Sequence, residues 1–291
     1  MSIQKRTDGY TKMANYGLIP TPPEVLEKYS KFDIVLPDDS TAFTIPRYNM
    51  MDKINPGDWI ARDQFLAASC SSFSVCAACE FLAMSNGLTK YTDLSELFMY
   101  WHARFEDNPN FNRNDPNLGT TIPANIRVAQ TLGVVHESEW RYRRDEPLKK
   151  FLVLDVEKEP PESVKRKASE QRIIDVKTVE MNDEKMKAIL ADDIPIVIGF
   201  SIFQPEFESD ETKKTGKIAL PPPNTNLPFS HAVLCVGFDD NEVNRDGSRG
   251  AWIFRNSRGP EWGNKGLGTL PYKYPRLPEQ WVVYKFSSVS I

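Results

Sequence analysis

The order of helix-like and strand-like segments restricts the fold of this chain more than any other feature. Apolar side chains recur at helical spacing in residues 69–84, and further helices are predicted near residues 93–105 and over residues 122–133. After residue 172 the pattern changes to short apolar runs that are typical of strands. Helices first and strands later predict an α+β protein with a helical half and a β half.

The predicted strands of the second half are rich in β-branched and aromatic residues. They cover residues 173–179, 194–203, 231–240, 250–257 and 280–286. At the other end of the chain, a proline cluster in residues 1–45 favours an extended leader over a regular helix. The charged residues 141–172 are expected to form a solvated connector with a short helix.

Composition is typical of a globular protein and excludes several classes of function. Of the 291 residues, 40% are hydrophobic and 26% are charged, and the net charge is -4. No dense block of Lys and Arg suggests nucleic-acid binding, and no run approaches the roughly 18 apolar residues of a membrane span. We therefore expect neither a nucleic acid nor a membrane as a partner. The polar start lacks the core of a secretory signal, so we expect a cytoplasmic protein, while signal-independent export stays open.

Two of the four cysteines, Cys76 and Cys79, form a C-x-x-C motif. Such a motif suggests a redox pair or half of a zinc site, but zinc would need a second close pair of ligands. The chain has no such pair, and its three histidines are scattered. We therefore expect both cysteines to be small core residues of the first helix, and we expect no metal and no cofactor.

A base and an orienting partner are predicted from the strands at 231–240 and 250–257. The Asn, Asp and Gly residues between them favour a hairpin turn with its midpoint near residues 243–244. Two residues then face each other across the hairpin when their numbers sum to about 487. His231 and Asn256 meet this condition. Opposed side chains have Cβ atoms roughly 4.5–5.5 Å apart, so Asn256 is within reach of the imidazole ring.

Cys70 stands at the start of the predicted buried helix, where the helix dipole and a nearby imidazolium both favour a thiolate. A thiolate that attacks a carbonyl also needs hydrogen-bond donors for the developing oxyanion. The backbone N–H of Cys70 and the side-chain amide of Gln64, in the loop before the helix, are the candidate donors. The conjunction of these residues is far more specific than any one of them.

These segments resemble those of papain-like cysteine peptidases. Gln64 and the "ASC" that ends in Cys70 resemble the family's nucleophile segment. "SHAVLCVGFDD" with His231 and "RNSRGPEWGNKGLG" with Asn256 are similar to its His and Asn segments, in the same chain order. "GTTIPANIRVAQTLGVVHESEW" and "DIPIVIGFSIF" also resemble parts of the compact microbial branch, so the resemblance covers roughly residues 17–290.

The resemblance implies a cysteine endopeptidase that hydrolyses peptide bonds through a thiol acyl-enzyme. It assigns the nucleophile to Cys70, the general base and later acid to His231, and the orienting amide to Asn256. It assigns the second oxyanion donor to Gln64. The substrate-contacting residues would be Gly119, Ala232 and Phe229.

The implied papain-like fold has two lobes with the active-site cleft between them. Residues 46–145 would form the mainly helical lobe with the nucleophile, and residues 146–291 an antiparallel, barrel-like β lobe with the His and Asn. Residues 1–45 would be a leader or pro-segment. The partner would be a peptide or protein substrate. The leader does not resemble the long helical pro-region of plant and lysosomal members, but from its length and proline-rich composition we expect it to lie extended along the cleft and inhibit the enzyme as in a zymogen.

Several positions depart from the family pattern. Phe65 and Ala68 stand where glycines are usual, so their side chains are expected to crowd the oxyanion loop. Arg258 replaces a tryptophan that shields the Asn–His hydrogen bond, and a guanidinium there would lower the pKa of the imidazole and weaken its ion pair with Cys70. Trp262 is retained and is expected to cover part of the gap. We predict a slow or tightly gated enzyme.

The alternative from another class is a catalytically impaired papain-like module that binds peptides or a partner protein, for which the same departures argue. An amidase or acyl transferase would keep the chemistry and change the acceptor, but the sequence offers no separate acceptor site. A serine hydrolase is disfavoured because the chain has no G-x-S-x-G motif.

Overall fold

A computed structural model of the chain describes residues 4–5, 11–12, 16–29, 31, 45–55, 57–85, 92–115, 117–143, 153, 155–179 and 181–288. The helices in this part of the chain are α1 (Pro23–Leu26), the 3-10 helix η1 (Met50–Lys53), α2 (Cys70–Ser85), α3 (Glu96–Asp107), α4 (Ile122–Thr131), α5 (Glu162–Ala168), α6 (Asp183–Ala191), α7 (Gln204–Phe207) and α8 (Asp210–Thr215). The strands are β1 (Gln4–Lys5), β2 (Thr11–Lys12), β3 (Arg47–Asn49), β4 (Gln171–Thr178), β5 (Ile196–Ile202), β6 (Phe229–Val243), β7 (Arg249–Arg255), β8 (Leu267–Pro271) and β9 (Arg276–Ser288).

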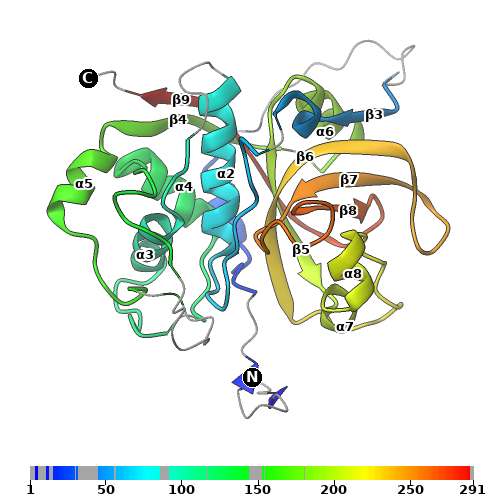
Figure 1. Ribbon diagram of the computed structural model, residues 1–291, viewed down its shortest axis with the longest axis horizontal. Helices are drawn as coiled ribbons and strands as arrows, with labels where there is room; N and C mark the ends of the chain where they lie inside the picture. The colour runs from blue at the N-terminus through cyan, green and yellow to red at the C-terminus, as the bar shows by residue number, and fades with distance from the viewer. Residues whose placement is uncertain are drawn as a thin grey trace.

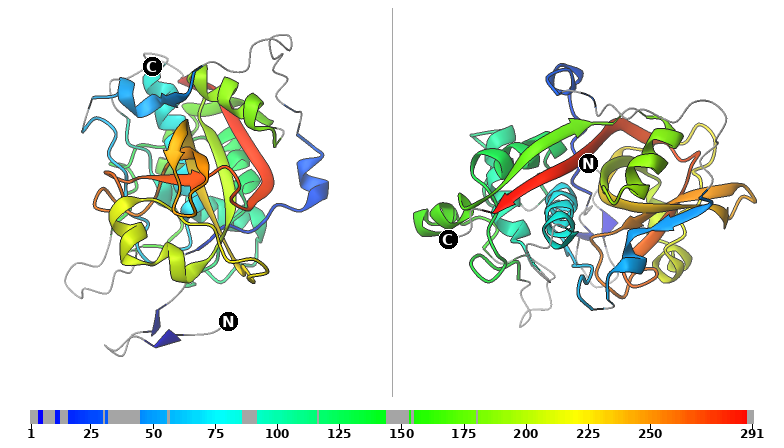
Figure 2. Two further views of the ribbon diagram at one scale, coloured as in Figure 1. Left: turned by 90° about the vertical axis from the view of Figure 1, so that its right-hand side faces the viewer. Right: turned by 90° about the horizontal axis from the view of Figure 1, so that it is seen from above.

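Two lobes meet along α2 (Figure 1). Helices α3, α4 and α5 lie in the helical lobe, and strands β5 to β8 lie in the β lobe. One antiparallel sheet runs in the order β4-β9-β5-β6-β7-β8, and β3 pairs with β6. The end of this sheet formed by β4 and β9 reaches the helical lobe (Figure 2), where β4 contacts α4 and α5. The α+β, two-lobe architecture expected from the sequence is therefore confirmed.

Helix α2 is buried along nearly its whole length. Apolar residues surround it rather than forming one stripe, and its buried side chains run from Cys70 to Ala83. It packs against α3 and α4 on one side and against β5, β6 and β9 on the other. Glu80 in its interior accepts hydrogen bonds from Trp59 Nε1 at 2.8 Å and from the Leu94 N–H at 2.9 Å, so the buried carboxylate is satisfied.

The three predicted helices of the first half are confirmed, with shifts of a few residues at their ends, and the five predicted strands correspond to β4, β5, β6, β7 and β9. α3 begins after Ser95, whose hydroxyl accepts a hydrogen bond from the Phe98 N–H. α4 ends shortly before Gly133, which has a φ of 96°. Cys76 and Cys79 are free, fully buried thiols of α2, as expected for core residues.

The leader is not extended throughout, so this part of the prediction is wrong. Residues 23–26 form the short helix α1, with Pro23 at its first position. Proline suits that position because the N–H that it lacks would have no partner inside the helix, and because its fixed φ is already helical. The proline cluster thus begins a helical turn where the sequence analysis expected it to exclude one.

The register of the β6–β7 hairpin also differs from the prediction. Its turn lies between the paired residues Val243 and Arg249, later in the chain than expected, and bulges shift the ladder twice. Each bulge adds an unpaired residue to one strand and so changes which residues face each other. His231 and Asn256 are consequently not direct cross-strand partners, since Asn256 lies just beyond the end of β7.

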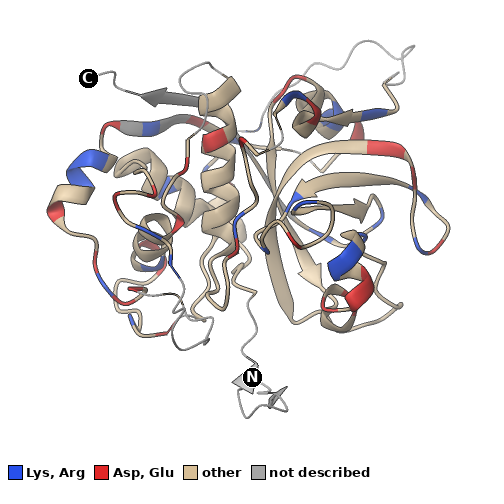
Figure 3. Ribbon diagram, in the orientation of Figure 1, with Lys and Arg blue, Asp and Glu red and all other residues tan. Residues whose placement is uncertain are grey.

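Charged side chains of both signs are interspersed over the two lobes (Figure 3). None of the helices in the described ranges is long and apolar enough to cross a membrane. The absence of nucleic-acid and membrane partners and the cytoplasmic location stay predictions from the sequence.

Arg62 anchors the loop that leads into α2. Its guanidinium lies 2.7 Å from Asp93 and from Glu137 and 3.2 Å from Glu96. Glu96 is buried, and burial raises the pKa of its carboxyl well above the ordinary value, while the charge of Arg62 lowers it. The cluster joins this loop to the start of α3 and to the segment after α4. The guanidinium is therefore the countercharge that these carboxylates require.

We expect Arg62→Met to lower the free energy of unfolding by about 3–5 kcal/mol, because it leaves a buried carboxylate without its countercharge. Urea unfolding followed by circular dichroism measures this loss. Arg127→Met is the matched control: it removes a surface partner of Glu106 and should cost less than about 1 kcal/mol. Equal losses in the two variants would contradict the role given to Arg62.

Candidate active site

Cys70 is the first residue of α2 and is fully buried. Burial raises the pKa of its thiol, whereas the backbone N–H groups of Ala232 and Gly17 and the guanidinium of Arg258 lower it. The helix N-terminus also favours a thiolate at this position. Because Ala232 follows His231 in β6, the His231 segment lies against the thiol.

The imidazole of His231 is held on one side by Asn256. Nε2 lies 2.8 Å from Asn256 Oδ1, and the same oxygen accepts a hydrogen bond from the Ser257 N–H at 2.9 Å. An amide oxygen only accepts, so Nε2 carries the proton. Nδ1 is buried without a hydrogen-bond partner and is the nitrogen left to exchange a proton. The expected His231–Asn256 contact is present, although it does not arise from direct cross-strand opposition.

The pKa of His231 is lowered to about 3. Burial is the main cause, and the charge of Arg258 adds to it, as the sequence analysis expected; the hydrogen bond with Asn256 and the charge of Glu208 act in the opposite direction. The pKa of Cys70 is raised at the same time. Both shifts therefore oppose a thiolate–imidazolium ion pair in this state.

Aromatic rings enclose His231. The ring centroids of Phe207, Phe200 and Tyr16 lie 5.4, 5.8 and 6.2 Å from the imidazole centroid. Trp262 packs against Phe207 at 6.0 Å and therefore stands behind this first layer. The shielding expected from Trp262 is thus indirect, and Phe207 is the nearest of the three rings around the imidazole.

Gln64 lies in the loop before α2 and is buried against the loop after β7. Its Nε2 donates to Ala67 O at 2.7 Å, and its Oε1 accepts a hydrogen bond from Ser257 Oγ at 2.6 Å. Its backbone N–H donates to Ser257 O at 3.0 Å. The amide is therefore tied both to the loop of the nucleophile and to the residue that follows Asn256.

Phe65 adopts a left-handed backbone conformation with a φ of 49°. A side chain in this region costs roughly 1–2 kcal/mol, which a glycine would avoid. The Phe65 N–H donates to Asp63 Oδ1 at 2.8 Å, and its ring stacks on Tyr142 in a small apolar cluster. These contacts hold the loop in the conformation that glycine would otherwise adopt freely.

Residues 16–19 of the leader, which we call the strap, lie against Cys70 and contact both lobes. On the helical side, the Thr120 N–H donates to Gly17 O at 2.8 Å, and Thr120 O accepts a hydrogen bond from the strap at 3.1 Å. On the β side, the Leu18 N–H donates to Ser230 O at 3.4 Å. Leu18 and Thr120 pair as parallel strands do.

Two glycines allow the strap to lie this close. A Cβ atom on Gly17 would stand 1.8 Å from Ala68 O, and one on Gly119 would stand 2.1 Å from Gly17 O. Neither position accepts a side chain without a shift of backbone. Gly119 therefore borders the strap, and the backbone pairing with the strap is made by the next residue, Thr120.

The other two expected substrate-contacting residues also lie beside the strap or the thiol. The ring of Phe229 lies 5.6 Å from that of Tyr16, and the backbone of Ala232 reaches Cys70. Sequence reasoning missed Tyr16 and Glu208, which lie together: the Tyr16 hydroxyl donates to Glu208 Oε1 at 2.5 Å. Neither residue belongs to a motif, so no sequence signal marked them.

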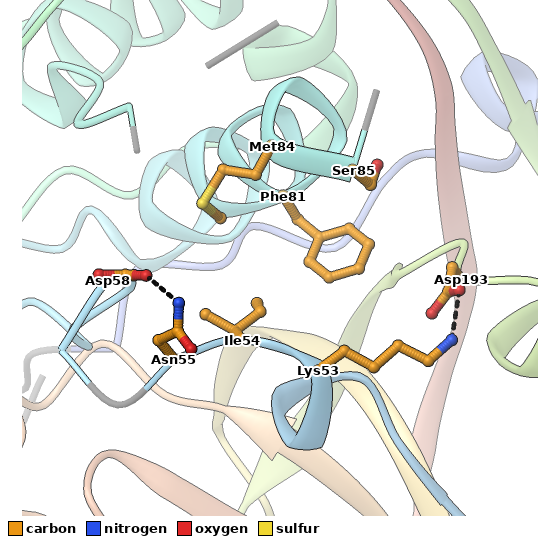
Figure 4. Close-up of a pocket in the computed structure, with 8 residues that line it drawn as sticks. All are labelled: Lys53, Ile54, Asn55, Asp58, Phe81, Met84, Ser85 and Asp193. Atoms are coloured by element: carbon orange, nitrogen blue, oxygen red, sulfur yellow. Dashed lines mark hydrogen bonds and ion pairs between the residues drawn. The ribbon is translucent and has the colours of Figure 1, made fainter. Parts of the chain in front are cut away.

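A pocket of about 360 Å³ lies near the C-terminal end of α2 (Figure 4). Phe81 and Met84 contribute apolar walls, and Lys53 and Asp193 form an ion pair of 2.6 Å at its edge. About 11 residues of helix, at roughly 1.5 Å each, separate Phe81 from Cys70. The pocket is therefore distinct from the thiol site.

No group of three or more His, Cys, Asp or Glu side chains in the described part of the chain is arranged to hold a metal ion. The expectations of no metal and no cofactor stay predictions. A thiol in contact with the backbone of Ala232, the residue that follows an imidazole oriented by an amide, is an arrangement suited to acyl transfer by nucleophilic attack.

Comparisons with known proteins agree with this chemistry. The family described as papain family cysteine protease matches residues 56–274. A curated relative, an uncharacterized peptidase C1-like protein of Acanthamoeba polyphaga mimivirus, is 29% identical over 214 residues. The match covers 73% of this chain and 64% of that protein, so the chain spans less than two thirds of the length of this relative.

Solved structures share the fold. The chain is similar to xylellain, a cysteine protease from Xylella fastidiosa, with a TM-score of 0.75 and 26% identity over 98% of this chain and 99% of that one. It also resembles a digestive procathepsin L2 proteinase from Tenebrio molitor larval midgut, with a TM-score of 0.66 and 16% identity over 94% and 79% of the two chains. The second likeness shows the fold alone.

We expect Arg258→Met to raise the pKa of His231 above about 3, because it removes a positive charge that opposes the imidazolium. Burial should still hold this pKa below the ordinary value of about 6.5. An NMR titration of the imidazole nitrogens of the full-length chain measures the change. Arg127→Met on α4 is the control and should leave His231 unaffected; an unchanged or lower pKa in Arg258→Met would contradict the assignment.

Proposed function

The chain belongs to the papain family of cysteine proteases and is a cysteine-type peptidase, and from this premise we propose that it hydrolyses peptide bonds with Cys70, His231 and Asn256. The observation that carries the proposal is the 2.8 Å contact between His231 Nε2 and Asn256 Oδ1. His231 lies in β6, and the next residue of that strand, Ala232, contacts the Cys70 thiol through its backbone. Peptides or proteins are the substrates.

In the first step, His231 Nδ1 takes the thiol proton and the Cys70 sulfur attacks the carbonyl carbon of the peptide. Asn256 fixes the ring so that Nε2 keeps its proton and Nδ1 accepts one. The imidazolium then gives its proton to the leaving amine, which departs with the C-terminal part of the substrate. Water, deprotonated by His231, hydrolyses the thioester and restores the thiol.

The tetrahedral intermediate carries a negative charge on the former carbonyl oxygen. We assign its stabilisation to the backbone N–H of Cys70 at the helix N-terminus and to the side-chain amide of Gln64. The support for Gln64 is its position: it is buried on the nucleophile loop and bonded to Ser257, next to Asn256. Its bond with Ala67 would have to be shared or exchanged when the oxyanion forms.

An epoxide that alkylates active thiolates, followed by peptide mapping, tests the nucleophile. We expect modification of Cys70 that is lost in His231→Ala, and kcat/KM for peptide hydrolysis to fall at least about 10³-fold in Cys70→Ala and His231→Ala. Cys79→Ala, which alters another buried thiol of α2, is the control and should keep its activity. Labelling spread over the other cysteines, or none at all, would instead favour the impaired peptide-binding module.

The same site supports a second part of the proposal, that the strap keeps the enzyme inactive. The strap offers the sulfur the N–H of Gly17, where a substrate offers a carbonyl carbon. The Gly17 carbonyl is directed to the Thr120 N–H instead. A strap bound in this way blocks access to the thiol and is not itself in position to be attacked by the sulfur, as in a zymogen.

Burial under the strap also disfavours the charged forms of the reacting groups. Desolvation raises the pKa of Cys70 and lowers that of His231, and both shifts oppose the thiolate–imidazolium pair. Departure of the strap admits water and reduces both shifts. The proposed inhibition is therefore steric and electrostatic together.

Gly17→Ala in the full-length chain tests the strap, because its Cβ atom would meet Ala68 O. We expect kcat/KM for peptides to rise at least tenfold, a change that requires only about 1.4 kcal/mol of destabilisation of the bound strap. Ile19→Ala, in the same segment with an exposed side chain, is the control. A chain without residues 1–45 should gain at least as much, and no gain in either form would contradict inhibition by the strap.

A further inference from the structure

The side chain of Tyr16 is enclosed by a group of residues from three separate parts of the β lobe. We call this group the Tyr16 box; its members are Phe207, Glu208, Phe229, His231 and Arg258. Tyr16 is only 9% exposed inside it. The box is thus a binding site for one aromatic side chain, and the strap fills it in this structure.

Each face of the phenol has a matching partner. The rings of Phe207 and Phe229 lie 5.7 and 5.6 Å from the Tyr16 ring, the first of them edge to face. The Arg258 guanidinium lies 5.3 Å above the Tyr16 ring, within the range of a cation–π contact. Its Nη2 atom is buried without a hydrogen-bond acceptor, so this charge is directed at rings rather than at a carboxylate.

The hydroxyl group has a partner of its own. The Tyr16 hydroxyl donates to Glu208 Oε1 at 2.5 Å, and the side chain of Glu208 is 21% exposed. A hydrogen bond to a charged acceptor is stronger than one to a neutral acceptor. An aromatic residue without a hydroxyl would leave this acceptor with one partner fewer.

The box lies on the side of the site where the leaving group must be. His231 has to protonate the departing amine, so the first residue of the C-terminal product lies next to its ring. Tyr16 is the strap residue whose ring contacts that of His231, at 6.2 Å. Leu18, two residues along the strap, instead pairs with Thr120 and Ser230.

We propose that the Tyr16 box is the specificity pocket for the residue that follows the cleaved bond, and that it selects tyrosine. This inference rests on the peptidase function proposed above and names the substrate class of that site. The walls are side chains, which recognise a phenol whichever way the backbone that carries it runs. Tyr16 of the strap therefore occupies the place of a substrate tyrosine.

Other side chains lose one or more of these contacts. Phenylalanine keeps the rings and the cation–π contact but lacks the hydroxyl for Glu208, and leucine lacks both polar contacts. A lysine side chain would be repelled by the like charge of Arg258, and a glutamate side chain by the like charge of Glu208. A neutral phenol is the side chain that satisfies all members of the box.

Five peptides of one sequence, with Tyr, Phe, Leu, Glu or Lys after the cleaved bond, test the preference. The enzyme is the full-length Gly17→Ala chain, and mass spectrometry identifies the bond that is cut. We expect kcat/KM for the tyrosine peptide to exceed that for the phenylalanine peptide about tenfold, since one hydrogen bond to a charged group is lost. The other three peptides should be cleaved more slowly still.

The double variant Gly17→Ala, Glu208→Met removes the acceptor and should bring the ratio of tyrosine to phenylalanine cleavage close to one. Glu211→Met in the same background is the matched control, because Glu211 is an exposed carboxylate of the neighbouring helix α8 and lies outside the box. It should keep the ratio. Cleavage without a tyrosine preference, or a preference that survives Glu208→Met, would overturn the inference.

A binding measurement judges the box separately from catalysis. The full-length Tyr16→Ala chain is titrated with p-cresol, the side chain of tyrosine as a free molecule, and with toluene, which lacks the hydroxyl. Ligand-observed NMR should show p-cresol bound about tenfold more tightly than toluene, and no binding at this site in the wild-type chain. Equal affinities of p-cresol and toluene, or binding of p-cresol to the wild-type chain as well as to the Tyr16→Ala chain, would overturn the inference about the box. If no peptide is cleaved, the peptidase mechanism fails while this measurement still decides on the box.

Discussion

The burial of α2 between the two lobes is the constraint on which the rest of the structure depends. A helix with apolar residues on all sides must be covered all round, and here α3 and α4 cover one side while β5, β6 and β9 cover the other. Cys70 is its first residue, so the same packing that buries the helix brings the thiol against β6. The position of the candidate nucleophile is thus a consequence of core formation.

The electrostatics of the site follow from that burial. Desolvation disfavours both the thiolate of Cys70 and the imidazolium of His231, and Arg258 further opposes the imidazolium while it favours the thiolate. The strap adds to this state because it covers the sulfur and its Tyr16 ring lies against the imidazole. These observations support the inhibition by the strap that we propose.

Much of the fold was accessible from local patterns, because helical periodicity, Ser95 as a cap and Gly133 as a terminator act within a few residues. The failures have local causes as well. Pro23 begins a helical turn rather than excluding one, and bulges in the β6–β7 ladder displaced the register on which the His231–Asn256 argument was based. That contact forms nonetheless, since Asn256 extends past the end of its strand toward the ring.

The sequence by itself determined the class of fold and the candidate nucleophile, base and orienting amide. It also gave the expectation that a guanidinium would oppose the imidazolium. All of these depend on residue type and on order along the chain. Only the tertiary structure decided that Phe207 rather than Trp262 contacts His231, and that Tyr16 meets Glu208. Contacts of this kind join residues up to 192 positions apart, and no local pattern encodes them. They arise when the buried core places distant loops side by side, which is a property of the packed chain.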